Sequence, residues 1–173
     1  RGTRSDTLVE SIDLAPTFVE YFGGTVRSNI LEGTSLLPLL HDSASIDREI
    51  VISEFDYSQR MLREDLGQKT GECMLTMAFD GRWKLVFAEG FDPMLYDLQA
   101  DPGEFHDLAG VPEHADQVAR LSAEIFRWAR RQHNRVTITN EQMEARTGDE
   151  VKKGILLGIR DQAHYDEVMK DKD

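Results

Sequence analysis

The feature that most constrains the fold is a β-hairpin signal near the middle of the chain. Residues 73–79 and 82–88 each alternate apolar with more polar or smaller side chains, and Asp80-Gly81 stands between the two runs. Asp-Gly favours a two-residue turn because glycine adopts positive φ without strain. The alternating apolar positions are Leu75, Met77 and Phe79 on the first run and Trp83, Leu85 and Phe87 on the return. The pattern predicts two antiparallel strands joined by a tight turn.

Two further runs extend this hairpin into a sheet. Residues 50–55 are rich in β-branched and aromatic side chains, and residues 94–98 alternate before an Asp-Pro-Gly turn at 101–103. Proline removes a backbone donor and glycine tolerates positive φ, so this turn ends the strand. Phe105 and Leu108 follow as apolar residues that we expect to anchor the turn on the core. Together the runs predict an antiparallel sheet of about four strands.

A helix is needed to cover one apolar face of such a sheet. Over residues 114–132, Val118, Leu121, Ile125 and Trp128 step by three, four and three, which is the spacing of an amphipathic helix. The sequence therefore predicts an α+β fold, with a small antiparallel sheet packed on this helix.

The N-terminal part predicts one more helix. Asp13 is placed as its N-cap, Pro16 lies in the first turn, and Gly23-Gly24 ends it. Leu14, Phe18 and Phe22 recur every four residues and share one face of this helix. Ser35, before the apolar run that follows, is expected to cap a helix and not to act as a nucleophile, because its surroundings are not Gly-x-Ser-x-Gly.

The pattern weakens after residue 135. Residues 139–142 resemble a capping box, residues 155–159 are apolar but too few to fold alone, and residues 161–172 predict at most a small polar helix. We expect two parts, a domain at 1–135 and a tail at 136–173. The tail is expected to dock on another domain or on a neighbouring subunit, and the second case predicts a homo-oligomer.

Composition excludes several partners. The 173 residues carry a formal charge of −12, which disfavours general nucleic-acid binding. No run approaches the roughly 20 apolar residues of a membrane span, and the N-terminus shows no apolar signal-peptide region. No membrane partner is expected, and a cytoplasmic location is favoured over a periplasmic one. The single cysteine, Cys73, excludes an internal disulfide and a multi-Cys zinc site.

The residue types show no catalytic or metal-binding constellation. The histidines lack metal-site spacing, no Gly-rich phosphate loop precedes a helix, and no carboxylate pair lies on an apolar background. The polar stretch 56–71 carries Tyr57, Arg60 and Arg63, which suit recognition of an anionic group at a pocket rim or a subunit contact. A solvated connection is the other interpretation of this stretch, so both stay open.

Three segments resemble sulfatases of the alkaline-phosphatase-like superfamily. They are Asp13-Leu14-Ala15-Pro16-Thr17, Glu32-Gly33-Thr34-Ser35-Leu36-Leu37-Pro38-Leu39-Leu40, and Leu95-Tyr96-Asp97-Leu98 with Asp101-Pro102, Glu104 and Asp107-Leu108. Glu32 and Asp107 replace the usual Asp and Asn of that family. Residues 53–58 with Arg82-Trp83-Lys84 are most similar to phosphonate monoester hydrolases and their arylsulfatase relatives.

This resemblance implies the C-terminal subdomain of an alkaline-phosphatase-like α/β fold, with residues 1–47 ending the main α/β domain. The family's nucleophile belongs to a Cys/Ser-x-Pro-x-Arg motif that matures to formylglycine, and Cys73-Met74-Leu75 does not match it. The family's metal ligands also belong to upstream segments. The resemblance thus implies no catalytic residue, metal ligand or cofactor in this chain. It implies a missing N-terminal catalytic domain that uses formylglycine and a divalent metal (Ca, Mn or Zn).

Two functions follow as expectations. The chain is either the C-terminal portion of a sulfuric-ester or phosphonate-monoester hydrolase, inactive alone, or a non-catalytic interaction and oligomerisation module. An upstream Cys-x-Pro-x-Arg motif in the reading frame distinguishes the first from the second.

Overall fold

The computed structural model describes residues 4–41, 46–131, 138–145 and 160–170 of the chain. The chain divides into two compact units, Arg1–Thr137 and Ile138–Asp173. None of the helices in these described ranges combines the length and the apolarity that a membrane span requires.

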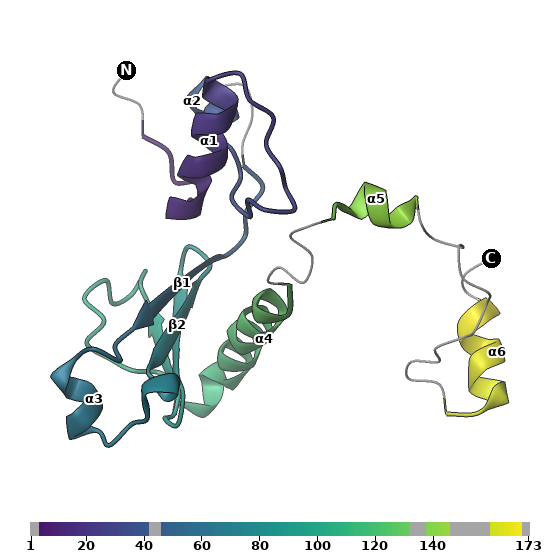
Figure 1. Ribbon diagram of the computed structural model, residues 1–173. Coiled ribbons are helices and arrows are strands. Elements are labelled where there is room, and N and C mark those ends of the chain that lie inside the picture. The colour runs from purple at the N-terminus through teal and green to yellow at the C-terminus, as the bar shows by residue number, and fades with distance from the viewer. Residues whose placement is uncertain (1–3, 42–45, 132–137, 146–159, 171–173) are drawn as a thin grey trace. The chain divides into compact units, whose positions relative to one another are not determined.

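A four-stranded antiparallel meander forms the centre of the first unit (Figure 1). Its strands are β1 (Val51–Asp56), β2 (Met74–Phe79), β3 (Trp83–Ala88) and β4 (Met94–Asp97). They pair in the order β1-β2-β3-β4. The predicted antiparallel sheet of about four strands is confirmed, because each strand pairs antiparallel with the next one along the chain.

The β2–β3 turn lies one residue later than the sequence signal. Phe79 pairs with Lys84, and Asp80 N donates to Trp83 O at 3.2 Å, which leaves Gly81 and Arg82 as the two central residues. Gly81 has φ +96°, a conformation that side-chain-bearing residues rarely adopt. The Asp80 carboxylate also accepts hydrogen bonds from the backbone N–H groups of Arg82 and Trp83, the third and fourth residues of the turn. Asp80 therefore organises the turn from its first position.

The core lies between the sheet and helix α4 (Ala115–Arg131), which runs beside it in Figure 1. Ala78, Leu85 and Leu95 pair across β2, β3 and β4 and so share one face, where they meet Leu121 of α4. All four are fully buried. Ile50, Ile52, Trp83, Leu108, Ala109, Val118 and Ile125 pack around them. The predicted helix and its apolar stripe are confirmed.

The two sets of alternating apolar residues predicted for the hairpin, one on each strand, lie on opposite faces of the sheet. Leu85 is on the core face with Ala78, so Leu75, Met77 and Phe79 are on the other face, half-buried. Strand β2 therefore carries apolar side chains on both of its faces. The register, which pairs residue 78 with 85, decides which of them meets the helix.

The segment after β4 corrects two expectations. Leu108 does anchor on the core, and its N–H donates to Leu95 O at 2.8 Å. Phe105 does not, because its side chain is 84% exposed. It lies instead against Gly103, where a Cβ would come within 2.2 Å of the ring. The positive φ of this turn also belongs to Glu104, at +58°, and not to Gly103.

The N-terminal segment, residues 4–41, holds a short 3₁₀ turn (Ser11–Asp13), helix α1 (Leu14–Tyr21) and helix α2 (Leu37–Leu40). Gly23, with φ +78°, follows α1 as expected. Asp13 holds the N-cap position, but its side chain does not cap the helix. Ser35 Oγ accepts from Leu37 N at 3.3 Å, but Leu36 holds the N-cap position of α2 without a side-chain capping bond, so Ser35 lies one residue before the cap.

Shorter elements complete the first unit. Helix α3 (Met61–Asp65) and a 3₁₀ turn (Thr70–Glu72) lie in the β1–β2 connection, and a second 3₁₀ turn (Pro112–His114) leads into α4.

The second unit contains α5 (Asn140–Glu144) and α6 (Gln162–Lys170). Thr139 Oγ1 accepts from Gln142 N at 3.2 Å and Gln142 Oε1 accepts from Thr139 N at 3.0 Å, so the predicted capping box is confirmed. The apolar run at 155–159 lies outside the described residues. The docking of residues 136–173 on another domain or subunit stays a prediction.

Candidate functional site

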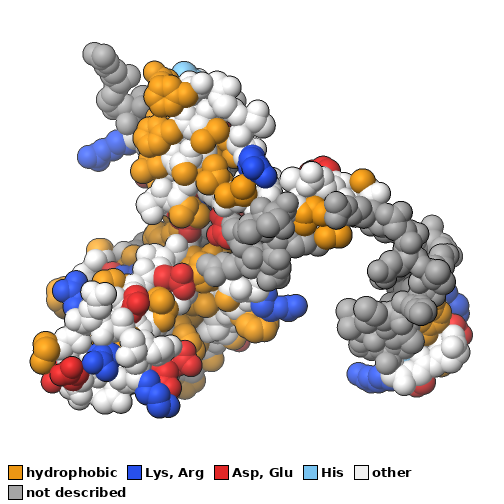
Figure 2. Space-filling view, viewed as in Figure 1, with side chains coloured by type: hydrophobic (Ala, Val, Ile, Leu, Met, Phe, Trp, Pro, Cys, Tyr) orange, Lys and Arg blue, Asp and Glu red, His pale blue; other side chains and the backbone are white. Residues whose placement is uncertain are grey.

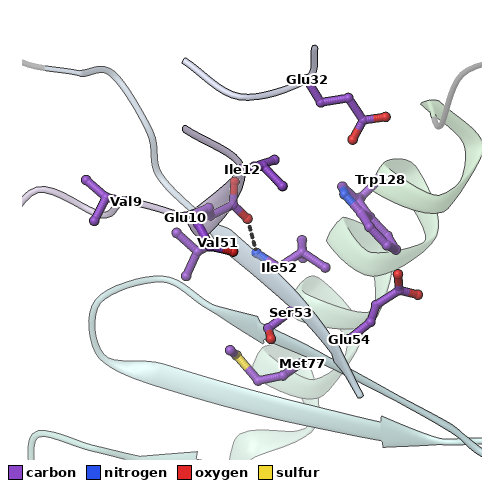
Figure 3. A pocket seen from close by; sticks show the side chains of 11 residues that line it. Val9, Glu10, Ile12, Glu32, Val51, Ile52, Ser53, Glu54, Met77 and Trp128 are labelled. Carbon is purple, nitrogen blue, oxygen red and sulfur yellow. Dashed lines mark hydrogen bonds between the residues drawn. The ribbon is translucent and has the colours of Figure 1, made fainter. Parts of the chain in front are cut away.

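A cavity of about 440 Å³ opens between the N-terminal segment, strand β1 and helix α4 (Figure 3). Trp128 of α4 lies on one side and Ile12 and Ile52 lie opposite it. The lining residues are Val9, Glu10, Ser11, Ile12, Glu32, Val51, Ile52, Ser53, Glu54, Met77 and Trp128. Since β1 is an edge strand, this cavity follows an open edge of the sheet as the structure describes it.

The lining supplies carboxylates, hydroxyls and apolar surface. One of its carboxylates is already used, because Glu10 Oε1 accepts from Ile52 N at 2.7 Å (Figure 3). Among the described lining residues there is no histidine, cysteine, lysine or arginine. A lining of carboxylates, hydroxyls and apolar side chains can pack against or bind a partner that is itself partly polar.

A buried ion pair lies next to the cavity and joins the N-terminal segment to the sheet. Arg48, just before β1, donates to the two carboxylate oxygens of Asp13 at 2.6 and 2.7 Å. The Asp13 side chain is 0% exposed and that of Arg48 is 12% exposed. Such a two-pronged pair fixes orientation as well as charge.

Backbone groups complete the environment of Asp13. Its oxygens accept from Glu10 N and Thr34 N, each at 2.8 Å. Burial raises the pKa of Asp13, but the hydrogen bond from Arg48 and the two backbone bonds outweigh it. The pKa therefore lies below its ordinary value of 3.8. Asp13 is therefore ionised, and its carboxylate holds together the backbone at residues 10 and 34 and the Arg48 side chain, an arrangement called here the polar hub.

Tyr57, Arg60 and Arg63 occupy the β1–β2 connection, and none of them lines the cavity. Tyr57 is 3% exposed, burial raises the pKa of its hydroxyl, and its N–H donates to Cys73 O at 3.0 Å. Arg60 is exposed, with its guanidinium 5.9 Å from the ring centre of Phe55.

Arg63 points back into its own loop, where Nε donates to Ser58 O at 3.0 Å. Tyr57 thus anchors the connection, Arg63 braces it and Arg60 remains on its surface. The role of these three residues at a pocket rim or subunit contact stays a prediction.

The acidic residues of the β4 turn organise backbone. Arg82 donates to both oxygens of Asp97, at 3.1 and 2.7 Å, and this bond holds the pKa of Asp97 below its ordinary 3.8. Asp107 Oδ1 accepts from Leu95 N at 3.0 Å and Ala109 N at 2.9 Å. A single oxygen makes both bonds, which explains why Asp serves where the resembling family usually has Asn.

Sequence reasoning missed the cavity and the Asp13–Arg48 pair. The two partners lie 35 positions apart, and neither carries a local signal beyond the cap position of Asp13. Within the described ranges, no group of three or more His, Cys, Asp or Glu side chains is placed to hold a metal ion.

The comparisons with known proteins agree with this architecture. The family model described as "N-sulphoglucosamine sulphohydrolase, C-terminal" matches residues 1–131. The chain belongs to this family of sulfatase C-terminal domains. Its relatives are sulfatases and phosphonate monoester hydrolases of the alkaline phosphatase superfamily.

Two curated relatives and one solved structure illustrate the likeness. The multifunctional alkaline phosphatase superfamily protein PehA of Trinickia caryophylli is 35% identical over 80% of the chain and 27% of its own length. Arylsulfatase K of Xenopus laevis is 35% identical over 68% of the chain and 22% of its own length. The phosphonate monoester hydrolase SpPMH from Silicibacter pomeroyi superposes with a TM-score of 0.69 at 33% identity, over 79% of the chain and 28% of that protein.

The sulfatase C-terminal domain therefore spans about a quarter of the length of the relatives it matches. The alkaline-phosphatase-like fold class and the family expected from the three sequence segments are confirmed.

Proposed function

We propose that this chain is the C-terminal portion of a metal-dependent sulfuric-ester or phosphonate-monoester hydrolase, and that it is inactive alone. One observation carries the proposal, namely the match to a sulfatase C-terminal domain over residues 1–131. The phosphonate monoester hydrolase SpPMH supports it, since it shares the fold of this chain over 28% of its own length. The remaining length of such relatives is where a catalytic half belongs.

The described residues do not fit a divalent metal or a formylglycine. No carboxylate and histidine group among them is placed to hold a metal. Cys73 is 2% exposed, and its Sγ lies 3.2 Å from Lys69 O inside the loop. In this proposal the metal and the formylglycine belong to the missing N-terminal domain, and residues 1–135 complete the fold with residues 1–47 ending its main α/β domain.

The connection between β1 and β2 supplies the proposed pocket rim or subunit contact. Arg60 is the residue best placed for recognition, because its guanidinium is at the surface while Tyr57 is buried. An arginine there offers a fixed fork of donors to a sulfate, a phosphonate or a carboxylate.

An interaction role for the tail is a second candidate. The family match ends at residue 131, so residues 136–173 are not assigned by it. In this proposal the tail holds a neighbouring subunit and makes a homo-oligomer, with or without a catalytic half upstream.

The test begins with the reading frame that contains these residues. The full-length protein and the 173-residue chain are assayed with an aryl sulfate and a phosphonate monoester, with and without Mn²⁺, Ca²⁺ or Zn²⁺. We expect metal-dependent turnover by the full-length protein and none by the chain. Turnover by the chain that one of its own residues abolishes would overturn the proposal.

The rim is tested in the full-length enzyme. Arg60→Gln removes the exposed guanidinium, and Tyr57→Phe removes only a hydroxyl and keeps the buried ring. Arg63→Gln removes the brace on Ser58. A rim role predicts that Arg60→Gln changes kcat/KM differently for the two substrates or changes the oligomeric state. Lys69→Gln, at a side chain that is 84% exposed, is the matched charge control. If all variants equal wild type, the connection is not a rim.

A further inference from the structure

Helix α1 presents an apolar face to solvent. Leu14 is 48% exposed, Phe18 57%, Tyr21 67% and Phe22 81%. These four residues, called here the α1 apolar face, lie at helical spacings of three and four and therefore share one side. Figure 2 shows hydrophobic side chains gathered over the region that Figure 1 labels α1 and α2.

Another part of the α1 surface is already covered within the chain. Thr17 is 6% exposed. Its Oγ1 donates to Asp13 O at 2.5 Å and accepts from Leu36 N at 2.8 Å. The polar contacts of Thr17 are thus satisfied within the chain, while the α1 apolar face leaves three aromatic rings and a leucine exposed to water. Adjacent exposed aromatic residues of this kind mark an interaction surface.

We propose that the α1 apolar face packs against the upstream catalytic half of the full-length enzyme. This inference rests on the proposed function. The occupant is argued from length and place, since the chain matches 27% of PehA and 28% of SpPMH. The family model describes a C-terminal domain, so the proposed catalytic half precedes these residues, and α1 is the first α-helix among the described ones. An apolar surface on the occupant suits this face, because the four side chains carry no charge and three of them have no polar atom.

The exposed aromatic residue of α4 makes a useful contrast. Phe126 is 64% exposed, similar to Phe18. However, the Arg130 guanidinium lies 5.5 Å from the centre of its ring. A cation over an aromatic face is a stable arrangement at a solvent-exposed site. Phe126 is therefore the matched control for Phe18: both are exposed helical phenylalanines, but only Phe18 belongs to an uncovered apolar group.

The experiment measures Phe18→Asp and Phe126→Asp in two settings, the 173-residue chain and the full-length protein. In the chain both changes are at exposed positions and should move Tm by less than about 2 °C. In the full-length protein Phe18→Asp should cause a marked fall in Tm or a loss of soluble protein, because a charge would enter an apolar interface. Phe126→Asp should leave both unchanged.

A milder variant, Phe18→Ser, gives a Tm even if Phe18→Asp fails to fold. Equal effects of the Phe18 and Phe126 variants in an active full-length hydrolase would overturn the inference and leave the proposed function intact. A full-length protein without hydrolase activity would instead overturn the proposed function, while the Tm comparison still tests the interface. A dimer of the 173-residue chain that Phe18→Asp dissociates would make a second copy the occupant and would also overturn the inference.

Discussion

The sheet with α4 and the N-terminal segment are held in opposite ways. The first region buries Ala78, Leu85, Leu95 and Leu121 completely and needs no partner for its central apolar face. The second, residues 4–41, buries Asp13 and Thr17 and leaves the α1 apolar face outside. A region that exposes an apolar face while it buries polar side chains is what the proposed packing on the catalytic half requires. The contrast teaches that one region buries its own apolar core, whereas the other is held by a buried ion pair and leaves apolar side chains exposed.

The largest expected effect tests the self-contained core. Leu121→Ala removes a fully buried side chain and should lower the free energy of unfolding by about 4 kcal/mol, because the neighbouring strands only partly fill the cavity. Urea unfolding followed by circular dichroism measures this loss. The control is Ala123→Gly, at an exposed position of the same helix, which should cost about 1 kcal/mol through helix propensity alone. Equal losses for both would mean that α4 does not seal the core.

The next prediction concerns the polar hub of the N-terminal segment. Asp13→Asn removes the nearer carboxylate from Arg48, whose side chain is only 12% exposed, and leaves Glu10 Oε2, 3.6 Å away, as its remaining ion-pair partner. Breaking a buried pair in this way should cost about 3 kcal/mol. The loss should be local, with faster hydrogen exchange at the amides of Thr34 and Ile52 and little change at Leu85. Uniform acceleration across the sheet would contradict the division into two regions.

Low pH should also destabilise the N-terminal segment, because it protonates Asp13. The pKa of Asp13 is lowered from 3.8, so its stabilising effect is complete above that value. The effect is lost as pH falls through the lowered pKa, since the unfolded chain then binds the proton more readily. The Asp13→Asn variant serves as the control, because it has no such group to protonate and its N-terminal exchange should depend less on pH in that range.

A further prediction probes how closely the N-terminal segment packs on itself. A Cβ at Gly33 would lie 2.2 Å from Ile12 O and 2.8 Å from Asp13 Cα. Both atoms are backbone and cannot rotate away, so Gly33→Ala should cost about 2 kcal/mol by overpacking. Gly71→Ala is the matched control, since nothing lies within 4 Å of its Cβ position. Differential scanning fluorimetry with hydrogen exchange at Thr34 reports both. If Gly33→Ala left the stability unchanged, the loop at 32–34 could move away from the 3₁₀ turn at residues 11–13 without an energetic cost.

The elements of the sheet region were predictable because their signals are local. Asp-Gly at 80–81, the alternation on each side and the stripe of α4 are each read within a few residues. What could not be predicted depends on distant partners. The face of β2 that meets α4 is set by a one-residue choice of register, and Asp13 serves Arg48, 35 positions away, in place of its own helix.

For the candidate site residues too, local sequence signals were predictable and contacts that depend on the folded loop were not. Residues 56–71 were identified as a polar excursion, yet burial of Tyr57 and the inward brace of Arg63 depend on how the loop folds over Cys73 and Ser58. Phe105 was expected inside because it is large and apolar. It lies outside because the turn at 101–104 directs it over Gly103. Side-chain type alone therefore did not predict that Tyr57 is buried and Phe105 exposed.

The smallest expected effect asks whether polar contacts matter in the sheet as they do in the N-terminal segment. Lys84 on β3 forms an ion pair with Glu104 at 2.8 Å, with side chains 24% and 35% exposed. Water reaches both groups, so Glu104→Gln should cost only about 0.5 kcal/mol, and that cost should shrink further in 0.5 M salt. Urea unfolding at two salt concentrations measures it, with Glu113→Gln, an exposed carboxylate ahead of α4, as the control for charge alone. A loss near that of Asp13→Asn would mean that the sheet also depends on ion pairs, and the contrast between an apolar core and a polar hub would then fail.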